Sequence, residues 1–170
     1  MMHALISLVL LLPYATLHAS QIQYGKERLE SLQGSGRVVL NETQIVGYVD
    51  VNGSLFANGA HLGSASINGQ ATLYDSTVEG KSVINGSLCA EKCTFRSAID
   101  ATAQKVSFTE CNLNSIHITK TPWPNGKQVV KLSNCNCRGG IVFDSGDGIV
   151  ILKNKSLVQG KVVGAVIQKI

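Results

Sequence analysis

Five cysteines are the side chains of this 170-residue chain with the clearest capacity for chemistry. Three of them stand in similar surroundings, "EKCTF" at Cys93, "TECNL" at Cys111 and "SNCNC" at Cys135. In an oxidising compartment, a neighbouring pair of this set would form a disulfide, and the odd total leaves at least one thiol unpaired. The alternative is a stack of buried free thiols, because cysteine packs readily as a small apolar residue.

A zinc site is a further interpretation of the same residues. In "CNC", Cys135 and Cys137 would point their thiols to one side of a strand, and Cys111 or Cys89 would have to complete the ligand set. The chain has no paired C-x-x-C motif, and no histidine falls near the three aligned cysteines. We therefore expect no metal and no cofactor.

Acidic residues provide the next candidates. Asp144 and Asp147 in "DSGD" are weak candidates for acid and base catalysis on a polysaccharide, and such an enzyme would need them on one flank with Glu110 and Lys131. A glycine-rich corner with turn-forming aspartates explains "DSGD" more simply. Signatures of nucleotide-binding loops, serine nucleophiles and metalloproteases are absent. We expect a protein that is not an enzyme.

The segment "TPWPNGK" contains the only tryptophan of the chain. Pro122, Trp123, Pro124 and Asn125 form a rigid loop that we predict to bind a partner, because an exposed indole suits a sugar ring or a protein surface. The alternative is that Trp123 folds back and covers the neighbouring strands.

A sequence repeat must position all these residues. "VNGSLFA", "INGQATL" and "INGSLCA" begin at Val51, Ile67 and Ile84, which are 16 and 17 residues apart. Apolar positions inside each unit recur in steps of five or six residues, so three short strands fit one unit. Such strands bury enough surface only when each stacks on its copy in the next unit. The Asn-Gly steps supply the corners.

The second half of the chain keeps this plan in longer units. One column of apolar residues has spacings of 16, 17, 18, 24 and 20, and the interval of 24 contains the insertion Thr119–Lys127. Its prolines and Asn-Gly suit a loop and not a central strand. The predicted column comprises Leu62, Val78, Phe95, Leu113, Cys137 and Leu157.

These features predict an all-β, single-stranded, right-handed parallel β-helix over residues 38–170, with three short strands in each rung of about 16 to 20 residues. A left-handed hexapeptide coil is disfavoured because five-residue steps interrupt its strict period. The run Val46–Phe95, with rungs such as "INGSLCAEKCTF", resembles the bactofilin family, and the resemblance extends over residues 38–168. It implies a scaffold of the cell envelope that stacks end to end. The export signal, the cysteines and the nine-residue insertion depart from that family.

The N-terminal segments are expected to differ from the repeat. "ALISLVLLLP" followed by "LHAS" resembles a secretion signal, and we assign residues 1–19 to it. Residues 20–37 are predicted to be a cap or linker, in which "KERLESLQG" forms a short helix across the open end of the coil. No later segment approaches the length of a transmembrane helix. We expect an exported protein, periplasmic or extracellular.

Charge is unevenly distributed along the chain. Residues 1–100 contain six Lys and Arg against eight Asp and Glu, whereas residues 101–170 contain nine against three, so the halves carry −2 and +6. We expect a non-catalytic structural or interaction protein of the envelope that self-associates end to end or binds an envelope protein. The alternatives are a binding module for an anionic envelope glycan and a polysaccharide-active enzyme. Nucleic acid is not expected, because the basic half lacks interleaved aromatic residues.

Overall fold

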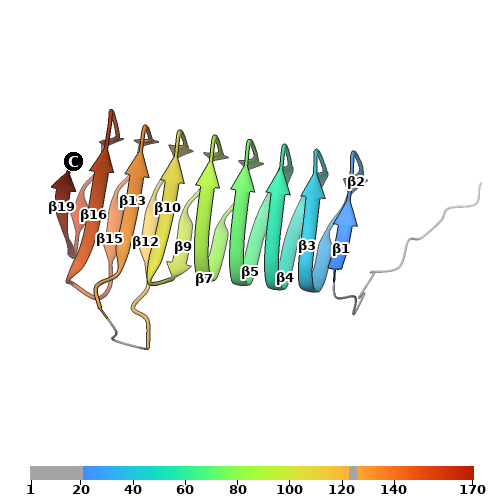
Figure 1. Ribbon diagram of the computed structural model, residues 1–170, viewed down its shortest axis with the longest axis horizontal. Helices are drawn as coiled ribbons and strands as arrows, with labels where there is room; N and C mark the ends of the chain where they lie inside the picture. Colours follow the sequence, from blue (N-terminus) through green and yellow to red (C-terminus); the bar gives the residue numbers. More distant parts are fainter. Residues whose placement is uncertain (1–20, 123–125) are drawn as a thin grey trace, which may run out of the picture.

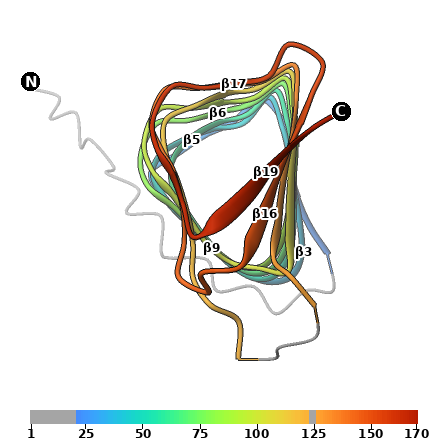
Figure 2. The ribbon, with the colours of Figure 1, turned by 90° about the vertical axis from the view of Figure 1, so that its left-hand side faces the viewer.

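Parallel strands stack along the whole described chain. The computed structural model describes residues 21–122 and 126–170. These residues form one 19-stranded sheet and no helix, and the chain winds through about nine coils. The winding is right-handed, with the strands nearest the viewer running upward as the chain advances from right to left (Figure 1) and the same sense visible along the axis (Figure 2). The predicted fold class is confirmed.

The strands shorten toward the C-terminal half because the corners there interrupt them more often. Their bounds are β1 Gln21–Tyr24, β2 Arg28–Leu29, β3 Leu32–Asn41, β4 Gln44–Asn58, β5 His61–Tyr74, β6 Thr77–Val78, β7 Ser82–Glu91, β8 Thr94–Phe95, β9 Ile99–Thr102, β10 Lys105–Thr109, β11 Asn112–Leu113, β12 Ile116–Ile118, β13 Val129–Ser133, β14 Asn136–Cys137, β15 Ile141–Phe143, β16 Gly148–Lys153, β17 Leu157–Val158, β18 Val162–Val163 and β19 Ala165–Lys169.

The coil has three faces. Face A contains β1, β10, β13, β16, β19 and the C-terminal parts of β3, β4, β5 and β7. Face B contains β2, β6, β8, β11, β14, β17 and the beginnings of β4 and β5. Face C contains β9, β12, β15, β18 and the middle parts of β4 and β5, with the beginnings of β3 and β7. Alternate residues of each face point into one continuous apolar core.

The repeated "NG" motifs form the corner between faces C and A. Val51 pairs with Ile67 and Ile67 with Ile84, so the three similar heptapeptides lie in register on successive coils. The glycine that follows each Asn has a φ near +140°, a conformation that side chains rarely adopt. The Asn85 side-chain amide donates to the Asn68 side-chain oxygen at 2.8 Å. This motif is therefore a stacked corner in the first half of the coil.

The predicted N-terminal helix is wrong. Residues in "KERLESLQG" form β2 and the start of β3, which continue the coil to its first described residues. Leu29 pairs with Ile45 and Leu32 with Val49, so both leucines extend core columns. Two apolar residues three positions apart fit one face of a helix as well as they fit two strands of a coil, so the sequence pattern alone does not distinguish them. Pairing with β4 selects the strands.

The predicted apolar column is correct except at its last member. Cys137 pairs with Val158, and Leu157 instead points outward, with 54% of its surface exposed. The turn before β17 has one more residue than the preceding turn, since Ser156 and not Lys155 occupies the place of Cys135. One added residue moves a side chain to the other face of a strand.

Candidate functional site

The turn between faces A and B brings the three aligned cysteines together, as predicted. Cys93, Cys111 and Cys135 each follow a residue with a φ of +54°, and each is 1–2% exposed. The main-chain N–H of Cys93 donates to Sγ of Cys111 at 3.4 Å, and that of Cys111 donates to Sγ of Cys135 at 3.4 Å. Each thiol in turn donates to the carbonyl two residues before it, at 3.1 to 3.3 Å. The thiols thus satisfy the polar groups of a tight turn.

Hydroxyl groups perform the same task in neighbouring coils. Ser76 Oγ accepts from the Ala60 N–H at 3.0 Å, and Ser156 Oγ accepts from the Cys135 N–H at 3.2 Å. Thr43 stands at the equivalent turn and donates to the Gly25 carbonyl at 2.7 Å. Apart from Ala60, the column holds small side chains that both accept and donate hydrogen bonds, and cysteine fits this geometry.

Contact between the stacked thiols separates their acidities. Contact with Cys135 is the largest cause that raises the pKa of Cys111, and the same contact lowers the pKa of Cys135 to about 7. Contact with Cys111 also lowers the pKa of Cys93. The Cys111 S–H can donate to a thiolate at Cys93 or at Cys135 in place of its hydrogen bond to the Thr109 carbonyl. A shallow depression of about 420 Å³ lies against Cys111 and Cys135, with Glu110 and Lys155 on its rim.

All five cysteines are free thiols in the structure, and the disulfide stays a prediction. Cys137 lies in the core outside the column, where burial raises its pKa to about 11. Cys89 is exposed on face A. No group of three metal-ligating side chains converges within residues 21–122 and 126–170.

The two aspartates of "DSGD" have different surroundings. The Asp144 carboxylate lies 2.8 Å from Nε2 of His117, and Nδ1 of His117 lies 3.7 Å from Asp100. Asp100 also pairs with Lys81 at 2.5 Å. These contacts link neighbouring coils of face C. The sequence did not predict them, because His117 is 17 residues from Asp100 and 27 from Asp144. Among the described residues, Asp147 forms no ion pair with this cluster.

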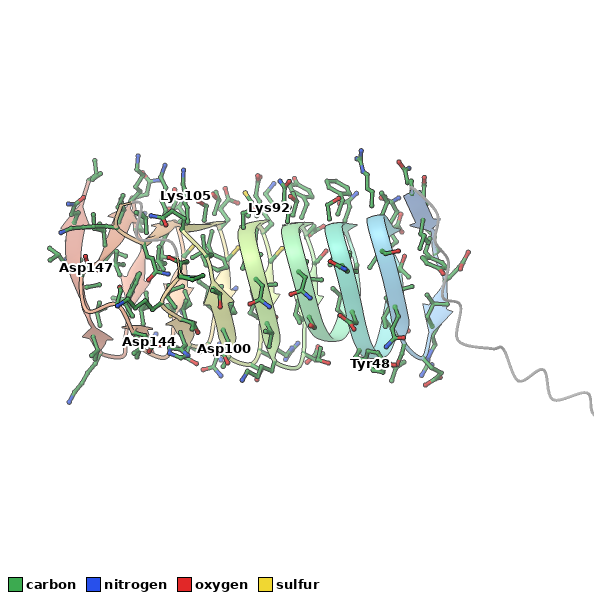
Figure 3. All side chains as sticks on the ribbon, turned by 90° about the horizontal axis from the view of Figure 1, so that it is seen from below. Tyr48, Lys92, Asp100, Lys105, Asp144 and Asp147 are labelled. Carbon is green, nitrogen blue, oxygen red and sulfur yellow. The ribbon has the colours of Figure 1, made fainter. Side chains whose placement is uncertain are left out.

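Three of the four residues named in the enzyme hypothesis come from different parts of the coil. Asp144 follows β15 at the end of face C, Glu110 lies in the turn between faces A and B, and Lys131 points outward from face A. Figure 3 shows Asp144 and Asp100 away from the edge that carries Lys105 and Lys92. Within residues 21–122 and 126–170, Asp144, Glu110 and Lys131 therefore do not share one flank of the coil.

Most of the predicted binding loop lies outside the described residues. Trp123, Pro124 and Asn125 are among those not described, and Pro122 is the last residue before them. The insertion leaves the coil at the corner between β12 of face C and β13 of face A (Figure 2). Gln128 follows the insertion and holds its first residue, because its buried Nε2 donates to the Thr119 carbonyl at 2.9 Å. The same amide donates to the Ala103 carbonyl on the preceding coil at 3.0 Å.

Replacing Gln128 with alanine should lower the free energy of unfolding by about 2 kcal/mol, because two carbonyls lose their donor in a buried place. Urea unfolding followed by circular dichroism measures the change. Gln104→Ala is the matched control: Gln104 Nε2 makes one exposed bond to the Lys127 carbonyl at 2.9 Å, and its loss should cost less than about 0.5 kcal/mol. Equal losses in the two variants would show that Gln128 does not hold the loop base.

The two ends of the coil leave strands with one partner each. At the N-terminal end, β1 pairs only with β3 and β2 only with β4 among the described strands. At the other end, β17, β18 and β19 pair only with β14, β15 and β16 in the same part of the chain. The last coil exposes apolar side chains at 46–74% of their surface: Leu157, Val163, Val166, Ile167 and Ile170.

Charge at the C-terminal end has a single sign. Residues 148–170 contain four lysines and no acidic residue. Two copies meeting through this end would place eight positive charges together, which opposes tail-to-tail contact. A head-to-tail contact places this end against residues 21–42, whose three basic and three acidic side chains balance.

Comparison with known proteins yields no relative. No family model, no curated protein and no solved structure matches the chain. None of the described residues forms a helix with the length and apolarity of a membrane span.

Proposed function

We propose that this protein is a non-catalytic, exported structural protein of the cell envelope whose copies associate head to tail through their terminal coils. The observation that carries the proposal is that, among the described strands, the terminal ones pair on one side only, at both ends of a straight coil (Figure 1). Unpaired parallel strands offer N–H and C=O groups to another chain, and exposed apolar side chains beside them favour contact.

The strands at the two ends also share one core column, so they can pair in register. The core column that begins at Ile22 continues through Val38 and ends at Val150 and Ile167. If β1 of one copy pairs in parallel with β19 of another, Ile167 stacks on Ile22 and the column continues across the contact. Such a heterologous contact does not close, so it generates filaments.

Light scattering over a range of protein concentrations and at low and high salt tests the association. The expected result is a mass that rises with concentration, and Ile167→Lys should return it to the monomer because a charge would enter the apolar contact. Phe56→Lys is the control, since Phe56 is 37% exposed but lies on the face A part of β4, with β3 between it and the edge strand β1. A monomer under every condition, or equal loss in both variants, would contradict the proposal.

A further inference from the structure

Three lysines follow one another along a diagonal of face A. Lys105, Lys131 and Lys153 lie on β10, β13 and β16, and each stands one coil onward and two residues further along than the one before. Neighbouring strands are about 4.8 Å apart and two residues span about 6.6 Å, so successive lysines are about 8 Å apart at their backbones. We call this row the lysine diagonal.

The lysine diagonal has no acidic neighbours in the sheet. An opposite charge directly across on the next strand would stabilise a lysine on a sheet surface. None of these three forms an ion pair within the described residues. Their cross-strand neighbours in the register are hydroxyl or aliphatic residues: Ser107, Val129, Ser133 and Ile151.

Three basic side chains elsewhere in the described residues are paired with carboxylates. Lys26 contacts Glu42 at 2.9 Å, Lys81 contacts Asp100 at 2.5 Å, and Arg96 contacts Glu79 at 3.0 Å. The acidic members of the cluster on face C, Asp100 and Asp144, lie away from the edge of the molecule that carries Lys105 (Figure 3). The lysine diagonal is therefore a row of uncompensated positive charge on a rigid parallel sheet.

The side chains beside the diagonal restrict the kind of anion that fits. Ser107, Thr109 and Ser133 point outward next to the lysines and are half-buried, so their hydroxyls can hydrogen-bond to sugar hydroxyls. Ser133 Oγ accepts from Asn154 Nδ2 at 2.9 Å, which leaves its O–H to donate. Proteins that bind single-stranded nucleic acid stack the bases on aromatic side chains. No aromatic residue points outward from β10, β13, β16 or β19, since Phe108 is in the core.

We infer that the lysine diagonal on β10, β13 and β16 binds a linear anionic polysaccharide. The carboxylate or sulfate groups of the polymer pair with Lys105, Lys131 and Lys153, and its hydroxyls bond to the adjacent serines and threonine. This site goes beyond the proposed association, because it uses outward side chains of face A and leaves the edge strands free.

Binding measured by isothermal titration calorimetry tests the site, with polygalacturonate and dextran sulfate as anionic probes. The triple variant Lys105→Gln, Lys131→Gln and Lys153→Gln should weaken binding by about tenfold and reduce its salt dependence. The control variant Lys120→Gln, Lys155→Gln and Lys161→Gln loses the same charge from corners of the same coils, and it should bind nearly as the parent does.

Several outcomes would overturn the inference. It fails if neutral dextran binds as tightly as the anionic probes, if oligothymidylate binds as tightly as polygalacturonate, or if neither anionic probe binds. Equal weakening in the two triple variants would show that net charge acts without a site. Light scattering on the same variants separates this result from the proposed association, because loss of the lysine diagonal should leave the mass unchanged.

Discussion

Replacing Gly69 with alanine is expected to lower the free energy of unfolding by about 3 to 5 kcal/mol. Gly69 has a φ of +141°, and a Cβ placed there would lie 2.0 Å from the carbonyl oxygen of Gly53 on the neighbouring coil. The main chain must move to relieve this contact, and hydrogen bonds between β4 and β5 would be lost with it. Urea unfolding followed by circular dichroism measures the loss.

Two other glycines separate the sources of this effect. Gly146 has a φ of +76°, but a Cβ placed there would have no other atom within 4 Å. Gly146→Ala therefore tests backbone strain alone, and it should lower the free energy of unfolding by about 1 kcal/mol. Gly25 has open space and no positive φ, and Gly25→Ala should change stability by less than about 0.5 kcal/mol. A loss in Gly69→Ala no greater than that in Gly146→Ala would refute close stacking at this corner.

Replacing Phe108 with alanine is expected to cost about 3 to 5 kcal/mol, because it leaves a cavity in the core. Phe108 is 1% exposed, and its ring meets that of Phe95 edge to face, with centroids 5.8 Å apart and planes at 87°. Its strand neighbours are Ala90 and Leu132, and Ala90 is too short to reach into the space left on its side. Urea unfolding measures this change also.

Two further variants serve as controls for the loss of stability in Phe108→Ala. Phe108→Leu keeps most of the buried volume and should cost less than about 1.5 kcal/mol. Phe56→Ala removes a ring from the outer side of face A, where 37% of the side chain is exposed, and should cost less than about 1 kcal/mol. If Phe56→Ala proves as costly as Phe108→Ala, the contact between Phe108 and Phe95 does not organise the centre of the coil.

The sequence carried enough information for the repeat and for the cysteine column. The positions of Val51, Ile67 and Ile84 measure the length of a coil, because strands in a stack can bury their apolar residues only if the spacing is kept. The same measure aligned Cys93, Cys111 and Cys135. It could not show why sulfur stands there, since that depends on N–H groups one coil away.

Errors arose where local patterns had two solutions. Leu29 and Leu32 satisfy a helix as well as a stacked coil, and only β4 beside them selects the coil. Leu157 was placed in the core because the extra residue in its turn could not be located without the hydrogen bond between Cys135 and Ser156. In both cases, a contact with another coil decided the result.

By itself, the sequence determined the all-β repeat, its corners and the placement of the insertion, because a stacked coil demands regular spacing of glycine and apolar residues. Only the tertiary structure placed His117 between Asp100 and Asp144, and it alone aligned Lys105, Lys131 and Lys153 across face A. Outward side chains obey no spacing rule of the core. Which of them become neighbours depends on strand register, and a shift of one residue would send each to the opposite side of its sheet.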